Sequence, residues 1–109
     1  MKTLRPSNCI RTVCMAGLLV YARAACAEVV STATHVPMRD GIELATDIYR
    51  DDGGKPAPVV LIRTPYDRTK QKATGERWVK AGYVFVAQDC RGTRASEGVL
   101  APYNNEGQD

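Results

Sequence analysis

The 109-residue sequence is poor in the residues that bind metals and form disulfides. It contains one histidine, His35, and four cysteines, of which only Cys90 lies beyond residue 27. Neither a Cys-x-x-Cys pair nor a Cys/His cluster with zinc-ligand spacing occurs. The sequence therefore predicts no metal, no cofactor and no intramolecular disulfide within residues 28–109.

The sequence also lacks an apolar run long enough to cross a bilayer as a helix. The candidate, residues 12–22 (TVCMAGLLVYA), follows a segment with three basic residues and precedes the small-x-small sequence Ala25-Cys26-Ala27. This order is typical of a secretory signal peptide, with cleavage before Glu28. We therefore expect residues 1–27 to be a signal peptide and the protein to be secreted or periplasmic. A buried N-terminal helix is the alternative.

The excess of positive charge lies in this leader. The whole chain has 15 Lys and Arg against 12 Asp and Glu, with a net charge of +3 and a pI of about 8.8. Four of the basic residues precede position 28 and every acid lies at or after it, which leaves 11 basic against 12 acidic residues. The basic pI therefore gives no reason to expect a nucleic acid or an anionic membrane as a partner.

The first half of the remaining chain predicts an antiparallel hairpin. Residues 34–38 and 42–49 flank Asp40-Gly41, a pair that suits a tight primed turn in which both central residues have positive φ. Pro37 cannot donate a ladder hydrogen bond, so the first arm is predicted at a sheet edge. The second arm alternates, which predicts a strand with one solvated face. Its inward positions are Ile42, Leu44, Thr46 and Ile48.

The pattern changes after residue 58 and indicates an α/β fold. Residues 59–63 (VVLIR) and 83–88 (YVFVAQ) are continuous apolar runs, typical of strands buried on both faces of a parallel sheet. Residues 75–81 between them are predicted to be helical, with Thr74 as the N-cap and Gly82 as the left-handed residue that ends the helix. The unit is then strand, helix, strand, and its last strand is expected to have an open edge.

Two polar loops follow these strands, at the sheet edge where open α/β sheets bind ligands. The first is RTPYDR (residues 63–68) and the second is DCRGTRASEG (residues 89–98). A carboxylate such as Asp89 could act in catalysis, but at a strand end it more often accepts backbone hydrogen bonds and holds the loop. Cys90 would need a paired base to act as a nucleophile, and only His35 is available.

Four segments of the sequence resemble the opening of one enzyme family. They are VPMRDGIELATDIYR (36–50), PVVLIRTPYDR (58–68), AGYVFVAQDCRGTRASEG (81–98) and PYNNEGQD (102–109). In this order and spacing they are similar to the N-terminal part of cocaine-esterase-like (CocE/NonD) hydrolases, which are X-Pro dipeptidyl-peptidase-like α/β-hydrolases. The resemblance predicts that residues 28–109 form the N-terminal portion of an α/β-hydrolase sheet.

The resemblance implies a serine hydrolase that cleaves small-molecule esters, amides or peptides through a Ser-His-Asp triad and an acyl-enzyme. The tyrosine of the family's R-x-P-Y loop contributes its hydroxyl to the oxyanion hole, and that position is Tyr66. A donor placed where negative charge develops can lower the barrier by about 3–4 kcal/mol. Tyr66 is therefore the one catalytic residue that the resemblance places in this chain.

The serine motif of the fold, G-x-S-x-G, does not occur in the sequence. Ser96 lacks the first glycine of that motif and is interpreted as structural, and His35 lies in the first strand. We therefore expect the nucleophile, acid and base to be absent from these residues, and the chain to be an inactive fragment whose last residues, to Asp109, fray. The alternative is a small secreted binding module that captures a partner at an open sheet edge.

Overall fold

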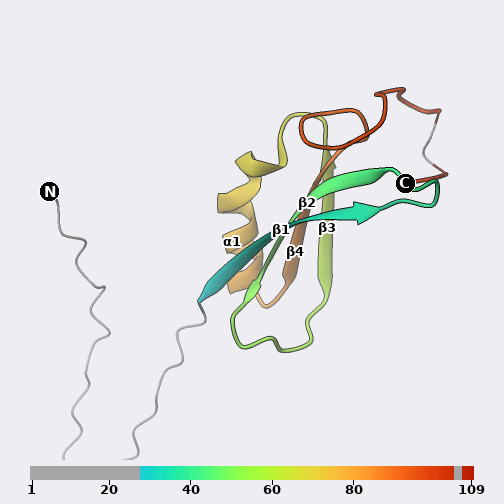
Figure 1. Ribbon diagram of the computed structural model, residues 1–109. Coiled ribbons are helices and arrows are strands. Elements are labelled where there is room, and N and C mark those ends of the chain that lie inside the picture. Colours follow the sequence, from blue (N-terminus) through green and yellow to red (C-terminus); the bar gives the residue numbers. More distant parts are fainter. Residues whose placement is uncertain (1–27, 105–106) are drawn as a thin grey trace, which may run out of the picture.

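The computed structural model describes residues 28–104 and 107–109, so the predicted signal peptide over 1–27 lies outside the described residues. The elements are β1 (Val29–Pro37), β2 (Glu43–Asp51), β3 (Val59–Thr64), the 3-10 helix η1 (Arg68–Gln71), α1 (Lys72–Lys80) and β4 (Val84–Asp89). They form one mixed sheet with the order β1-β2-β4-β3 (Figure 1). β2 is antiparallel to β1 and β4, whereas β3 and β4 are parallel. The predicted hairpin and β-α-β unit are confirmed.

The hairpin connection is longer than the predicted two-residue turn. Met38 donates its N–H to the carbonyl of Ile42 (2.8 Å), and Gly41 donates to the carbonyl of Met38 (3.0 Å). Gly41 has φ of 84°, while Asp40 is not among the residues with positive φ. The prediction of a two-residue primed turn was therefore wrong. A three-residue connection that ends in a left-handed glycine gives the same reversal, and it leaves the side chain of Asp40 free for another contact.

β2 is buried on both faces, which corrects the prediction of a half-solvated strand. Leu44 and Ala45 are fully buried, and Thr46, Asp47 and Tyr49 are at most 8% exposed. β2 is an interior strand between β1 and β4, and α1 and η1 also pack against it. Its polar residues face protein partners instead of water. β1 lies at the sheet edge, as Pro37 indicated.

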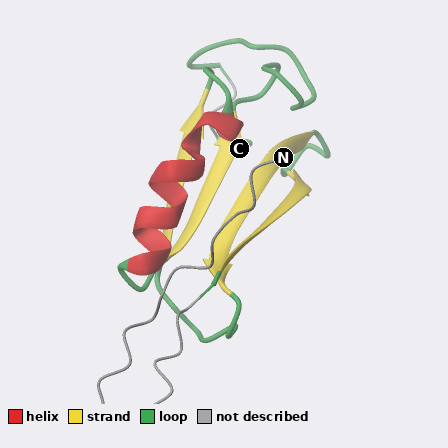
Figure 2. Ribbon diagram, turned by 90° about the vertical axis from the view of Figure 1, so that its left-hand side faces the viewer, coloured by secondary structure: helices red, strands yellow, loops and turns green. Residues whose placement is uncertain are grey.

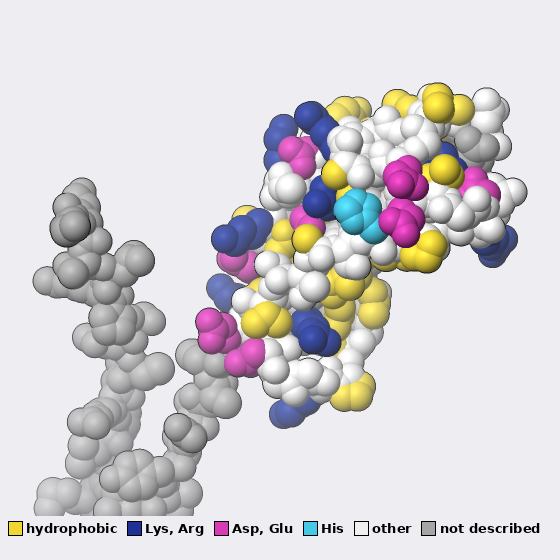
Figure 3. Space-filling view, in the orientation of Figure 1, with side chains coloured by type: hydrophobic (Ala, Val, Ile, Leu, Met, Phe, Trp, Pro, Cys, Tyr) yellow, Lys and Arg dark blue, Asp and Glu magenta, His cyan; other side chains and the backbone are white. Residues whose placement is uncertain are grey.

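The open side of the sheet belongs to β3 and not to the last strand. β4 follows β3 in the sequence, but in the sheet it lies between β2 and β3. Burial along β3 alternates: Val60 and Ile62 pack against the core, while Val59 and Leu61 are 62% and 54% exposed. The prediction that β3 is buried on both faces is therefore wrong for the described residues. Figure 3 shows the hydrophobic side chains along this strand.

Helix α1 covers one face of the sheet (Figure 2). The core between helix and sheet consists of Val79 from α1 and Tyr49, Phe85 and Ala87 from the sheet. Gly75 is buried at the point of contact, where an added Cβ would lie 2.8 Å from Cγ of Tyr49. The helix can therefore approach the sheet closely.

The helix begins three residues earlier than predicted, at Lys72, and Thr74 lies inside it and is not its N-cap. The preceding turn η1 is capped instead by Asp67, whose carboxylate accepts a hydrogen bond from Thr69 N. Gly82 has φ of 93°, in agreement with its predicted role after the helix. No helix among the residues that the structure describes is both long and apolar enough to span a membrane.

Candidate functional site

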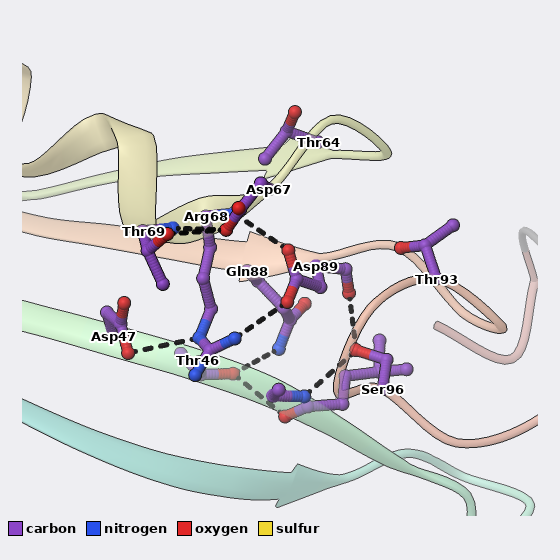
Figure 4. Close-up of polar contacts among 12 residues, drawn as sticks. Thr46, Asp47, Thr64, Asp67, Arg68, Thr69, Gln88, Asp89, Thr93 and Ser96 are labelled. Atoms are coloured by element: carbon purple, nitrogen blue, oxygen red, sulfur yellow. Dashed lines mark hydrogen bonds and ion pairs between the residues drawn. The ribbon is translucent and has the colours of Figure 1, made fainter.

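The two polar loops meet at the carboxyl ends of β3 and β4. Thr64 and Asp89 are the last paired residues of these parallel strands, so the chain leaves both strands at the same level. The loop after β3 carries Tyr66 and leads into η1. The loop after β4 folds back onto the beginning of β2 (Figure 4). We call this region the rim, defined as residues 63–68 and 89–98.

Arg68 joins the first loop to two buried carboxylates. Its backbone N–H donates to Oδ1 of Asp89 (2.8 Å), its Nη1 to Oδ2 of Asp89 (2.7 Å) and its Nε to Oδ1 of Asp47 (3.0 Å). The Asp89 side chain is completely buried. Burial alone would lower the pKa of Arg68, but hydrogen bonds and charge attraction from Asp89 and Asp47 raise its pKa overall. Asp89 therefore holds a loop, which is the structural role weighed from the sequence.

Ser96 fastens the second loop to the sheet. Its hydroxyl donates to the carbonyl oxygen of Asp89 (2.9 Å) and accepts from the N–H of Ala45 (2.9 Å). Next to it, Glu97 exchanges backbone and side-chain hydrogen bonds with Glu43, at 2.9 and 3.0 Å. The hydroxyl of Ser96 is thus used by two backbone partners, in agreement with its interpretation as a structural serine.

The buried Arg91 forms a second charged cluster with two less buried carboxylates, which sequence reasoning did not find. Its guanidinium donates to both carboxylate oxygens of Asp40 (2.8 and 3.1 Å) and, through Nε, to Asp109 (2.9 Å). The hydrogen bond that Arg91 donates lowers the pKa of Asp40, and the hydrogen bonds that Asp109 and Asp40 accept from Arg91 raise the pKa of Arg91. Asp109 is therefore held in place, which contradicts the prediction that it frays. The signal was the turn residue Asp40, which we had interpreted only as a turn former.

Gly92 lets the second loop close on itself. It has φ of 68°, and a Cβ at this position would lie 2.1 Å from the backbone N of Leu100. Any other residue would clash with backbone, which cannot move aside as a flexible side chain can. The glycine thus allows the backbone of Val99 and Leu100 to pass directly against the start of the second loop.

Tyr66 projects from the first loop. The residue is 77% exposed, and its backbone N–H donates to Oγ1 of Thr64 (3.0 Å). The next residue, Asp67, has φ of 106° and ψ of 106°. Its carboxylate accepts from Thr69 N and Oγ1 at 3.0 and 2.6 Å, which lowers its pKa. The tyrosine therefore lies at the tip of a loop whose base is tied down on both sides.

A cavity of about 620 Å³ lies beside this loop and is lined partly by Pro65, Cys90, Leu100 and Tyr103. Burial raises the pKa of the Cys90 thiol, which favours the neutral form. The one histidine, His35, is an exposed residue of β1. Cys90 thus lacks the paired base that a nucleophilic cysteine needs. In the part of the chain that the structure describes, no group of three His, Cys, Asp or Glu side chains could hold a metal ion.

The fold and the rim define the N-terminal part of an α/β-hydrolase-type sheet, and comparisons with known proteins agree. Residues 40–109 match the family model of the X-Pro dipeptidyl-peptidase (S15 family). The chain belongs to this family. It is also 42% identical over 86 residues to cocaine esterase from Rhodococcus sp. (strain MB1 Bresler), covering 73% of this chain and 15% of the esterase.

Solved structures show the same arrangement. An α-amino acid ester hydrolase superposes with a TM-score of 0.62 at 35% identity, covering 73% of this chain and 15% of the hydrolase. An aminopeptidase from a marine sediment archaeon, Thaumarchaeota archaeon, superposes with a TM-score of 0.60 at 32% identity, covering 74% and 16%. The chain therefore spans about 15% of the length of these relatives. The resemblance inferred from four sequence segments is confirmed at the level of family and fold.

Proposed function

We propose that this chain supplies the oxyanion side of a serine hydrolase that cleaves ester or amide bonds through an acyl-enzyme. The observation that carries the proposal is the position of Tyr66, exposed on a tied-down loop at the carboxyl ends of two parallel strands. This is where open α/β sheets bind ligands. Membership of a family whose relatives include an esterase, an ester hydrolase and an aminopeptidase supports the reaction class.

Tyr66 has the chemistry that the proposed step needs. When a nucleophile adds to an ester or amide carbonyl, negative charge collects on the carbonyl oxygen. A phenol hydroxyl that already points to that position stabilises the charge without reorganising. Ser96 and Asp89 are engaged in holding the loops, and Cys90 has no activating base. The nucleophilic serine, acid and base are therefore proposed to lie outside residues 28–109.

The test begins with the coding sequence beyond codon 109. We expect it to continue into a G-x-S-x-G motif followed by an Asp and a His, and a sequence without them contradicts the proposal. In the longer protein, Tyr66→Phe should lower kcat for p-nitrophenyl esters by about 10²–10³ with little change in KM. The matched control is Tyr83→Phe, at the other end of β4, where the ring packs against Trp78. The 109-residue chain serves as the blank and should show no serine-dependent turnover.

We also propose that the protein is secreted or periplasmic, on the basis of the basic, apolar and small-residue order of residues 1–27. Expression in a bacterial host, followed by N-terminal sequencing of the exported protein, should give a chain that starts at Glu28. A protein that stays inside the cell with Met1 intact contradicts this localisation.

A further inference from the structure

The loop that carries Tyr66 passes through a backbone conformation that L-residues rarely adopt. Asp67 has φ of 106° and ψ of 106°, outside the regions open to a residue with a Cβ. Such a conformation persists only where the surrounding structure enforces it. The side chain of Asp67 contacts Thr69, on the helix side of the turn. It therefore caps η1 and leaves the tyrosine side of the turn to other contacts.

Two anchors enclose the strained turn. On the strand side, the 6%-exposed Thr64 accepts the N–H of Tyr66 at 3.0 Å. On the helix side, Arg68 makes three hydrogen bonds to two carboxylates, and its side chain is only 15% exposed. One of these bonds uses the backbone of Arg68 itself, so the main chain directly after Asp67 is fixed to the end of β4.

We propose that Arg68 is the positioning residue of Tyr66. Its ion pairs with Asp47 and Asp89 hold the strained turn at Asp67, so that the tyrosine stays over the carboxyl ends of β3 and β4. The consequence for catalysis rests on the proposed role of Tyr66 as oxyanion donor, but the positioning itself does not.

The arginine on the other side of the tyrosine has a different task. Nε of Arg63 donates to Oε1 of Gln88 at 2.7 Å, and Gln88 in turn donates to Thr46. Gln88 and Asp89 are neighbours on β4, so their side chains point to opposite faces of the sheet. Arg63 thus tightens the strands and does not contact the strained turn, which makes Arg63→Lys a matched control for Arg68→Lys.

The experiment measures backbone order in the 109-residue chain by ¹⁵N relaxation. A lysine at position 68 keeps the charge and the backbone hydrogen bond to Asp89, but it has one ammonium nitrogen in place of the two guanidinium nitrogens that bind Asp47 and Asp89. In Arg68→Lys, the order parameter of the Tyr66 and Asp67 amides should fall from about 0.85 to below about 0.6. The amides of Phe85 and Ala87 should not change. Arg63→Lys should leave all four amides as in the unsubstituted chain.

The proposal is overturned if the order parameter of the Tyr66 amide is the same in Arg68→Lys as in the unsubstituted chain. It is also overturned if this amide is already mobile in the unsubstituted chain. If Arg68→Lys does not fold, Asp47→Ala replaces it, because that variant removes one partner and leaves the Arg68–Asp89 pair neutral. An order parameter at Tyr66 that Asp47→Ala leaves unchanged also overturns it. Full activity of Tyr66→Phe in the longer enzyme contradicts only the catalytic role of the tyrosine, so the two failures are distinguishable.

Discussion

At the scale of single residues, the rim contains buried charged side chains that form ion pairs with residues of opposite charge. Asp89 is fully buried and Arg91 is 7% exposed, yet no buried side-chain nitrogen or oxygen in the described residues lacks a hydrogen-bond partner. Removing one member of such a pair leaves a buried charge unpaired, which is strongly destabilising. Each guanidinium also bridges two carboxylates from different parts of the chain, a geometry that lysine cannot reproduce.

The Asp40–Arg91 pair gives a prediction for pH. The pKa of Asp40 is lowered from 3.8 in the folded protein, mainly by the hydrogen bond from Arg91. A lowered carboxyl pKa adds stability above the unfolded pKa, and this contribution is lost as the pH falls through the folded pKa. The thermal midpoint of the unsubstituted chain should therefore exceed that of Asp40→Asn at neutral pH, and the gap should begin to narrow as the pH falls below about 3.8.

Circular dichroism melts between pH 7 and pH 3 measure this gap. Glu28→Gln, at an exposed carboxylate before β1, is the control and should show no comparable gap. A difference between the unsubstituted chain and Asp40→Asn that stays constant across the whole range would show that the charge of Asp40 contributes nothing.

At the scale of elements, the contact between α1 and the sheet depends on one glycine. Gly75 is buried against the rings of Tyr49 and Phe85, with 2.8 and 3.0 Å from an added Cβ to the nearest atom of each ring. The two rings themselves are tilted by 50° with centroids 6.0 Å apart. Because both rings belong to interior strands, neither can move aside without disturbing the core.

Gly75→Ala should therefore destabilise the fold in spite of the better helix propensity of alanine. Overpacking of a core costs about 1–3 kcal/mol, and the gain in propensity offsets about 1 kcal/mol of this. We expect a net loss of about 1 kcal/mol in the free energy of unfolding, measured by urea titration. Gly53→Ala is the control, because its nearest neighbour is an ordinary contact at 3.5 Å. A more stable Gly75→Ala would show that the helix can shift outward.

The helices and strands also show which features of the structure could be predicted from the sequence. Local signals were sufficient for the strands, the helix and the glycine after it, because Gly82 and the apolar runs act within a few residues. The burial of β2 could not be predicted from its alternating pattern, since its buried polar residues Asp47 and Thr46 find partners 21 and 42 positions away. The structural role of Asp89 could be predicted from its place at the end of a strand. Its partner Arg68 could not, because the two residues are 21 positions apart.

At the scale of the whole molecule, one face of the sheet is covered by α1, and β3 has a neighbour on one side only among the described residues. Val59 and Leu61 lie more than half exposed on this strand. An exposed apolar strand with an unpaired side is a site of self-association. Tyr66 extends from the end of the same strand, so the proposed active site and the unpaired side are adjacent.

The 109-residue chain should therefore associate with itself as its concentration rises. Leu61→Lys should shift the sedimentation profile toward monomer, because the charge must leave water when two such faces meet. Thr34→Lys places the same charge on an exposed position of β1, at the other edge of the sheet, and should leave the profile unchanged. A monomeric unsubstituted chain, or an equal effect of both lysines, would argue against β3 as the contact.

The position of β4 in the sheet dictates an order of assembly during synthesis. The hairpin of β1 and β2 needs only its own residues, but Thr46 and Gln88, which join β2 to β4, are 42 positions apart. In the part of the chain that the structure describes, β3 pairs only with β4, so we expect β3 to leave the ribosome unpaired and to stay so until Asp89 has been made. Insertion of β4 then joins the four described strands and brings the two loops of the rim together in a single step.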